Sequence, residues 1–129
     1  GCYIVDDDFI LVTRWLLDHV PADANPLEEL SKAFLHRSAT TAAKYETTKE
    51  EKGVFLMKQV KDGGAEGVIF AAPSFCDPAL LERPMLQDVL KQHGVPYTAF
   101  KYAENTGQMA PIREQSGTFA DSIKLWSAS

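Results

Sequence analysis

A single cysteine in the stretch Gly67–Pro78 is the residue best placed to do chemistry. Cys76 follows the small and apolar run Gly67–Ala72, which is typical of a strand buried on both faces of a parallel sheet. Pro73 ends that strand because proline has no N–H to give to the ladder. We therefore expect the thiol in a short loop just past the carboxyl end of a strand, the edge at which open α/β sheets bind ligands.

The residues around the thiol favour its charged form. Asp77 and Pro78 are typical of a helix start, with aspartate as the cap and proline in the first turn. The N–H groups and dipole of a helix N-terminus favour a thiolate, the form of cysteine that binds metal. Ser74 and Asp77 can orient groups at this thiolate, or they can simply satisfy the backbone of the turn and the cap. Cysteine is also a common small core residue.

Other polar residues are candidates for the same edge, and each has a structural alternative. The acidic run Asp6–Asp8 can hold Mg²⁺, although we interpret it as a solvated loop that caps the next helix. Lys101 and Tyr102 end a later predicted strand and are placed to point into this edge. Arg113 can meet an anion there or lie on the surface. We interpret Cys2 as a core residue at the opposite edge.

The three histidines give weaker signals. His93 precedes Gly94 and is predicted to end a helix, where a positive charge is favoured. His19 and His36 have no partner that the sequence reveals.

Length, charge and cysteine content exclude several classes of function. The 129 residues suffice for one domain with a core, and the net charge of −5 does not suit a nucleic-acid groove. No apolar run is long enough to cross a membrane. Two cysteines make no disulfide framework, which favours a reducing cytoplasmic setting. The chain starts in a strand pattern without methionine, and we interpret it as a fragment of a longer protein.

Hydrophobic periodicity predicts alternating strands and helices along the chain. The expected strands are Cys2–Val5, Gly67–Ala72 and Pro96–Tyr102. In the first half of the chain we expect a short buried helix within Phe9–Leu17 and an amphipathic helix at Pro26–Arg37. A third helix is expected to begin with a capping box at Thr48–Glu51 and to end at Gly63-Gly64. After the middle strand we expect a single turn at Pro78–Arg83, a main helix from Pro84 to His93-Gly94, and a last helix that begins at Pro111. Ser38–Thr48 is interpreted as loop or weak helix, and Glu104–Ala110 as a polar loop.

This order predicts the fold class. Alternating strands and helices favour a three-layer α/β sandwich, with a short, mainly parallel sheet flanked by helices, Rossmann-like or flavodoxin-like. We expect one domain over residues 1–129. The loops after the three strands, around Asp6–Asp8, Pro73–Asp77 and Ala103–Gly107, are then expected at one edge.

Longer motifs resemble a known family. The run from Gly67 to Leu86, with Phe75-Cys76-Asp77 at its centre, and the strand-opening Gly94-Val95-Pro96 resemble the C-terminal domain of the benzoyl-CoA reductase and 2-hydroxyacyl-CoA dehydratase family. The segments Phe100–Gln108 and Pro111–Ile123 look most similar to benzoyl-CoA reductase, in particular to its gamma-type subunit. The resemblance covers nearly the whole chain and is most specific from Glu66 to Leu125.

The resemblance implies an oxidoreductase with an iron–sulfur cofactor. In such subunits three cysteines hold a [4Fe–4S] cluster, and Cys76 matches the ligand from the Phe-Cys-Asp loop. The other two ligands have no counterpart in this chain, so the isolated fragment is expected to be inactive and to carry no cofactor. The implied partners are a homologous cluster-binding subunit, ATPase subunits, ferredoxin as electron donor and an acyl-CoA substrate. The implied reaction reduces the ring of benzoyl-CoA to a cyclic diene thioester. No Gly-rich phosphate loop with lysine is present to bind ATP.

Three other functions remain open from the sequence. One is a 2-hydroxyacyl-CoA dehydratase of the same family, which recycles an electron instead of consuming it. Another is a signalling domain of the phospho-acceptor type, for which Asp6–Asp8 and Lys101 are suitable residues, although no acceptor aspartate ends the middle strand. The last is an α/β domain that only docks to a partner.

Overall fold

A computed structural model of the chain describes residues 1–8, 19–22, 25–37, 49–103 and 109–127. It consists of two compact units, one formed by Gly1–Asp6 with Leu56–Ser129 and the other by Asp7–Phe55. We call the first the sheet unit, because it holds both strands and Cys76. The single domain expected over residues 1–129 stays a prediction.

Five helical segments and two strands make up the described part of the chain. They are α1 (Pro26–Lys32), a π-helical turn (Ala33–Arg37), α2 (Lys49–Asp62), β1 (Val68–Pro73), α3 (Asp77–Gln92), β2 (Tyr97–Tyr102) and α4 (Met109–Ser127). The sequence therefore predicted β1 and β2 to within about a residue, while α4 begins two residues before the expected Pro111.

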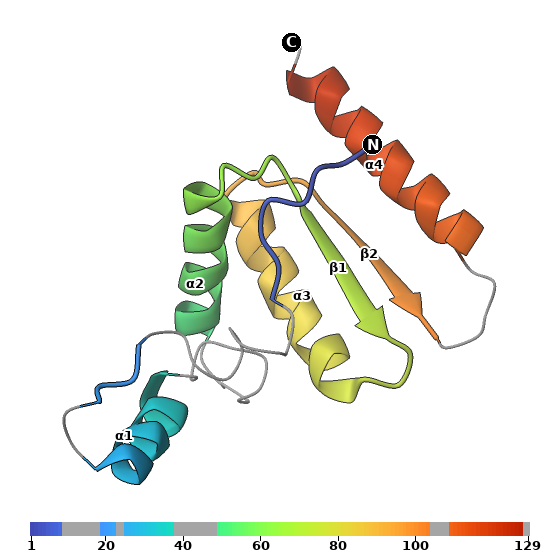
Figure 1. Cartoon of the computed structure of the whole chain (residues 1–129). Helices are drawn as coiled ribbons and strands as arrows, with labels where there is room; N and C mark the ends of the chain where they lie inside the picture. The colour runs from blue at the N-terminus through green and yellow to red at the C-terminus, as the bar shows by residue number, and fades with distance from the viewer. Residues whose placement is uncertain (9–18, 23–24, 38–48, 104–108, 128–129) are drawn as a thin grey trace. The chain divides into compact units, whose positions relative to one another are not determined.

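The two strands form a parallel sheet. β1 pairs with β2 in a register that runs from Val68 opposite Tyr97 to Pro73 opposite Tyr102. The strands run in the same direction, with α3 as the crossover between them, so both strands end at the same edge of the sheet. Figure 1 shows the strand pair with α3 and α4 on opposite sides of it. The α/β fold class, with a short parallel sheet between helices, is thus confirmed.

Helix α4 packs on one face of the sheet. A β-carbon placed on Gly67, just before β1, would lie 2.7 Å from Cδ1 of Ile123 and 2.8 Å from Cζ of Phe119. Nearer the start of α4, Nε2 of Gln115 donates a hydrogen bond to Oγ1 of Thr98 in β2, over 3.1 Å. Paired residues of parallel strands share a face, so the face that α4 covers carries Gly67 and Thr98.

The other face of the sheet carries the aromatic contact and the buried side chains that α3 covers. Phe70 and Tyr97 meet edge to face, with ring centroids 6.2 Å apart. Ala72, two residues beyond Phe70 and hence on the same face, is buried, and Leu90 of α3 is fully buried. This core is small, so the sheet unit depends on every well-packed contact that it has.

Glycines end α2 and α3 as the sequence predicts. Gly64 after α2 has φ +61°, and Gly94 after α3 has φ +69°. These are left-handed values that glycine adopts without the steric cost of a β-carbon. His93 is the last residue before Gly94, and its N–H still donates to the carbonyls of Val89 and Leu90.

The second unit contains α1, whose ends are stabilised by side chains. Asn25 caps the helix by accepting a hydrogen bond from the N–H of Leu27. In the last turn, Nζ of Lys32 lies 2.8 Å from a carboxylate oxygen of Glu28 and 2.9 Å from one of Glu29. These hydrogen bonds raise the pKa of Lys32 above its ordinary value. The predicted helix Pro26–Arg37 is thus helical throughout, although its last five residues form a π-helical turn.

The predicted strand Cys2–Val5 is wrong. No strand is present there, and the sheet of the described residues has only β1 and β2. Instead, Val5 Cγ2 and Asp6 Cβ lie against Gly63 at the end of α2. A strand needs a ladder partner for its N–H and carbonyl groups, and β1 pairs only with β2.

The predicted interruption of α3 at Pro84 is also wrong. The sequence indicates a single turn at Pro78–Arg83 and a new helix from Pro84, but α3 is continuous from Asp77 to Gln92. Proline inside a helix removes one hydrogen bond and usually causes a bend instead of a complete stop. Figure 1 shows the first turns of α3 set at an angle to the rest.

Several predictions fall outside the described residues. These are the short helix within 9–17, the loop or weak helix at 38–48 with the capping-box residue Thr48, and most of the polar loop 104–110.

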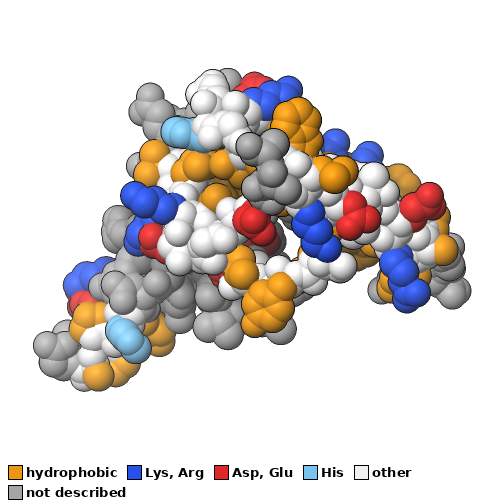
Figure 2. Space-filling model, turned by 90° about the horizontal axis from the view of Figure 1, so that it is seen from above, with side chains coloured by type: hydrophobic (Ala, Val, Ile, Leu, Met, Phe, Trp, Pro, Cys, Tyr) orange, Lys and Arg blue, Asp and Glu red, His pale blue; other side chains and the backbone are white. Residues whose placement is uncertain are grey.

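Apolar side chains reach the surface of the sheet unit in several places. Figure 2, seen from the side at which the strands begin, shows such side chains among charged ones. The strongly exposed large apolar residues of this unit are Tyr3, Ile4, Val5, Phe75, Leu81, Tyr102, Met109, Leu125 and Trp126. Single exposed apolar residues are ordinary on protein surfaces, so exposure alone does not indicate a binding surface.

Candidate functional site

A tight turn carries Cys76 away from the end of β1. The N–H of Cys76 donates to the carbonyl of Pro73 over 3.2 Å, which closes a four-residue turn. The N–H of Ser74 donates to the carbonyl of Tyr102 over 2.6 Å, so the turn is also tied to the end of β2. Cys76 therefore lies at the carboxyl edge of the sheet, as the sequence predicts.

Cys76 is itself the N-cap of α3. Its carbonyl accepts a hydrogen bond from the N–H of Leu80 over 3.1 Å, and its sulfur makes no capping hydrogen bond. The prediction that Asp77 is the cap is therefore wrong, because Asp77 is the first residue inside the helix. The residue is partly exposed, so a half-buried thiol stands at the positive end of a sixteen-residue helix.

The neighbouring residues Ser74 and Asp77 flank the thiol on both sides. Ser74 is partly buried and Asp77 is exposed in the first turn of α3. The backbone N–H of Ser74 ties the turn to β2, and the role of its side chain in satisfying the turn stays a prediction. A direct action of either side chain on the sulfur stays a prediction.

Lys101 and Tyr102 lie at the same edge as Cys76, on opposite faces of the sheet. In the register Lys101 is paired with Ala72 and Tyr102 with Pro73. Both side chains are exposed, as is Arg113 in the first half of α4. The strand order thus brings Lys101 and Tyr102 to this edge, and the described contacts give Arg113 a surface position.

Asp6 does not reach this edge. Its Oδ2 accepts a hydrogen bond from Nε2 of Gln59 over 3.2 Å, and its β-carbon lies 3.9 Å from the β-carbon position of Gly63. Both partners belong to the end of α2, which precedes the start of β1, so Asp6 lies toward the opposite edge. The expected gathering of Asp6–Asp8 with Cys76 is wrong for Asp6, because residues 2–5 form no strand that would carry it across.

Cys2 is exposed, so its predicted place in the core is wrong. Its sulfur donates to the carbonyl of Ser116 in α4 over 3.6 Å. Cys2 and Cys76 are both free thiols. Of the histidines, His93 and His19 are exposed, and the His36 side chain lies outside the described residues.

Among the described residues, the donor atoms at this edge fit a single ligand of a metal cluster. Within the described ranges, no three histidine, cysteine or carboxylate side chains come together as a metal site would require. A thiol at a helix N-terminus, outside the ladder and not used as a cap, is nonetheless a suitable single ligand. Any cluster bound here needs its other thiolates from another polypeptide segment.

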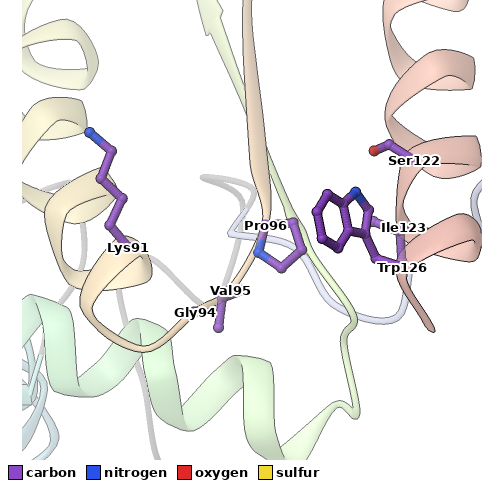
Figure 3. Close-up of a pocket in the computed structure, with 7 residues that line it drawn as sticks. All are labelled: Lys91, Gly94, Val95, Pro96, Ser122, Ile123 and Trp126. Carbon is purple, nitrogen blue, oxygen red and sulfur yellow. The ribbon is translucent and has the colours of Figure 1, made fainter. Parts of the chain in front are cut away.

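A cavity of 290 Å³ lies at the opposite edge of the sheet unit. Figure 3 shows its seven lining residues, with the indole of Trp126 directed toward the ring of Pro96 and the Lys91 ammonium directed away from them. It lies between the end of α3, the start of β2 and the last turns of α4. Cys76 is not among the lining residues, so this cavity is no part of the thiol site.

Sequence reasoning missed Phe75. This residue has φ +68° in the turn before Cys76, and its side chain is 93% exposed. The sequence indicates a tight turn without glycine between Pro73 and Asp77, but it does not show which residue takes the positive φ.

The family of the chain follows from comparison with known proteins. The model of the family "2-hydroxyglutaryl-CoA dehydratase, D-component" matches residues 1–123, so the chain belongs to this family of acyl-CoA dehydratase and reductase subunits. The chain is 65% identical, over 127 residues, to a benzoyl-CoA reductase subunit of Thauera aromatica. That match covers 98% of the chain and 33% of the relative.

Dehydratase subunits are more distant relatives. The beta subunit of (R)-phenyllactyl-CoA dehydratase from Clostridium sporogenes is 28% identical over 73% of the chain and 24% of the relative. The beta subunit of (R)-2-hydroxyglutaryl-CoA dehydratase from Acidaminococcus fermentans is 27% identical over 93% of the chain and 32% of the relative. The chain thus spans at most about a third of the length of these curated relatives. No solved structure matches it.

None of the helices in the described part of the chain combines the length and the apolar character needed to cross a membrane.

Proposed function

We propose that the chain is part of an ATP- and ferredoxin-dependent benzoyl-CoA reductase. The supporting observation is the 65% identity to a benzoyl-CoA reductase subunit, against 28% or less for the dehydratase subunits. The proposed reaction reduces the aromatic ring of benzoyl-CoA to a cyclic diene thioester. The role proposed for this chain is to contribute one ligand, Cys76, to a [4Fe–4S] cluster.

The geometry at the sheet edge supports this role for Cys76. Its thiol stands at the N-terminus of α3, past the end of β1, and makes no capping hydrogen bond. The hydrogen bond from Ser74 N–H to Tyr102 carbonyl fixes the turn to the sheet and so holds the sulfur in a defined place. When bound, a [4Fe–4S] cluster of low potential supplies single electrons. The chain's own contribution is to hold one iron and to limit access of water to it.

The partners proposed for such an enzyme are those that the family resemblance implies. We propose a homologous cluster-binding subunit, ATPase subunits, ferredoxin as the electron donor and an acyl-CoA thioester as the substrate. A cytoplasmic location is proposed with them, and the two free thiols are compatible with its reducing conditions.

We expect the isolated chain to purify without iron and without activity. One thiolate is too few to hold a cubane, and the described residues offer no group of three metal donors near Cys76. Iron and acid-labile sulfide analysis of an anaerobically prepared sample is the measurement. Stoichiometric iron and sulfide in the monomeric chain would contradict the assignment of a single ligand.

Product analysis of the complete enzyme tests the proposed reaction. The complex that contains this chain is incubated with ATP and reduced ferredoxin, once with benzoyl-CoA and once with a 2-hydroxyacyl-CoA. A cyclic diene thioester from benzoyl-CoA supports the reductase. Loss of water from the 2-hydroxyacyl-CoA, with no ring reduction, would support the dehydratase instead.

A further inference from the structure

The hydrogen bonds between the two strands show which backbone groups of the sheet point outward. The N–H of Val68 donates to the carbonyl of Pro96 over 3.0 Å, and the N–H of Ser74 donates to the carbonyl of Tyr102 over 2.6 Å. In a parallel pair, every second residue of a strand directs its N–H and carbonyl groups at the partner strand. The residues that direct these groups away from the partner strand are therefore Ile69 and Ala71 in β1, and Tyr97, Ala99 and Lys101 in β2.

The outer edge of β2 is suited to end the sheet. Nε2 of Gln115 in α4 donates a hydrogen bond to the outward carbonyl of Ala99 over 3.0 Å. Lys101 follows at the next outward position, and its side chain is exposed. A lysine on an edge strand disfavours pairing with a further strand, because that pairing would bring its charge among apolar neighbours.

β1 has the composition of an inner strand. Its residues, Val68–Pro73, include no charged side chain and no side chain that forms hydrogen bonds. Continuous apolar strands are typical of parallel sheets whose two faces are covered, whereas edge strands usually carry charges that prevent further pairing. Pro73 takes the last outward position and has no N–H to give. Pairing on the outer side of β1 can therefore use the N–H groups of Ile69 and Ala71.

The described residues of the sheet unit supply no partner strand for this edge. They are residues 1–6, 56–103 and 109–127, and their sheet contains β1 and β2 only. The segment Cys2–Val5, whose pattern suits a strand, instead contacts Ser116 and Gly63. Because a sheet of two strands is marginally stable by itself, a third strand on β1 would stabilise the unit.

The backbone chemistry of this edge and the length of the relatives identify the occupant. Outward N–H and carbonyl groups at the spacing of a strand are satisfied by another extended polypeptide segment. The match to the Thauera subunit covers 33% of that relative, so two thirds of such a subunit has no counterpart in this chain. A strand from the same polypeptide also avoids the entropic cost of bringing two molecules together.

We propose that a third strand joins the sheet at the outer edge of β1, and that the remaining part of the complete subunit supplies it. The backbone groups of this strand pair with those of Ile69 and Ala71. Its side chains are apolar on both sides, because they extend the two layers between the sheet and the helices α3 and α4. The proposal rests on the strand register and on the family of the chain, and it is independent of any metal bound to Cys76.

Hydrogen–deuterium exchange at single-residue resolution tests the pairing directly. The rates are measured in the isolated chain, in the complete subunit and in the complete enzyme. We expect the N–H groups of Ile69 and Ala71 to exchange rapidly in the isolated chain and about 100-fold more slowly in the complete subunit. The N–H groups of Tyr97 and Lys101, at the outer edge of β2, are the control, and we expect equal rates for them in the chain and the subunit.

Three results of this exchange experiment would overturn the proposal. Slow exchange of Ile69 and Ala71 in the isolated chain would show that this chain covers the edge itself, with residues inside or outside the described ranges. Slow exchange in the complete enzyme alone would assign the strand to a partner subunit. Rapid exchange in all three samples would show that no strand pairs with β1 on this side.

Proline substitutions give a second test by thermal melting. Ala71→Pro removes an outward N–H and its ring blocks a neighbouring strand, while the pairing with β2 loses no hydrogen bond. We expect the melting temperature to change little in the isolated chain and to fall by about 5 °C in the complete subunit. Lys101→Pro, at an outward position of β2, is the matched control and should leave both melting temperatures close to those of the wild type. Equal melting temperatures of the two variants in the complete subunit, or unfolding of the isolated Ala71→Pro chain, would contradict the proposal.

Discussion

Replacement of Cys76 by serine is expected to leave the chain folded and to inactivate the complete enzyme. The thiol is partly exposed, does not cap α3 and is close in size to a hydroxyl, so the change in unfolding free energy should be about 1 kcal/mol or less. In the enzyme the same change removes a proposed iron ligand. Loss of an outer-shell partner alone typically costs about 10- to 100-fold in activity, so loss of the ligand should cost more. Thermal melts of the chain and ATP-dependent ring reduction by the complex are the measurements.

Cys2→Ser is the matched control for this experiment. Cys2 is also a free thiol, exposed and in contact with the carbonyl of Ser116, but it is distant from the turn that carries Cys76. We expect it to keep full activity. Normal turnover by Cys76→Ser would remove the proposed role of Cys76. Unfolding of the Cys76→Ser chain would instead show that the thiol is structural.

Replacement of Gly67 by valine is expected to destabilise the sheet unit by about 3 kcal/mol. The first added carbon would lie 2.7 Å from Ile123 Cδ1, 2.8 Å from Phe119 Cζ and 3.2 Å from the carbonyl oxygen of Pro96. Ile123 Cδ1 and Phe119 Cζ are the ends of side chains that can turn only within the packed layer between α4 and the sheet, and the Pro96 oxygen belongs to the backbone beside β2. The two further methyl groups of valine increase the overlap.

Gly117→Ala in α4 is the matched control, because an added β-carbon there meets nothing within 4 Å. Alanine is favoured over glycine inside a helix, so this variant is expected to gain about 0.5–1 kcal/mol. Urea denaturation of both variants, followed by circular dichroism, gives the comparison. Equal midpoints for Gly67→Val and the wild-type chain would show that α4 does not pack on the sheet as described.

Local signals in the sequence predicted the sheet unit well. Proline at position 73 ends β1, and glycines at positions 64 and 94 end α2 and α3, because each of these residues imposes a backbone constraint on its own. The order of strand, helix and strand then placed Cys76 at the carboxyl edge without any knowledge of contacts. Such predictions succeed where a single proline or glycine determines where a strand or helix ends.

Predictions that depended on partners elsewhere in the chain failed. The pattern of residues 2–5 suits a strand, but no strand forms there without pairing, which local sequence cannot specify. Pro84 was predicted to start a helix, but α3 continues through it from Asp77 to Gln92. Phe75 was missed because its strain becomes visible only in the turn geometry. The cofactor was likewise inferred from the family resemblance and not from spacing.

The assignment of Cys76 as a ligand can be tested by electron–nuclear double resonance of the reduced cluster in the complete enzyme. The protein is prepared with ¹³C at the β-carbon of cysteine, as wild type, as Cys76→Ser and as Cys2→Ser. Each cysteine bound to iron gives its own ¹³C hyperfine coupling. We predict that Cys76→Ser loses one coupling, or the cluster signal altogether, and that Cys2→Ser matches the wild type. A Cys76→Ser spectrum identical to that of the wild type would show that Cys76 does not bind the cluster.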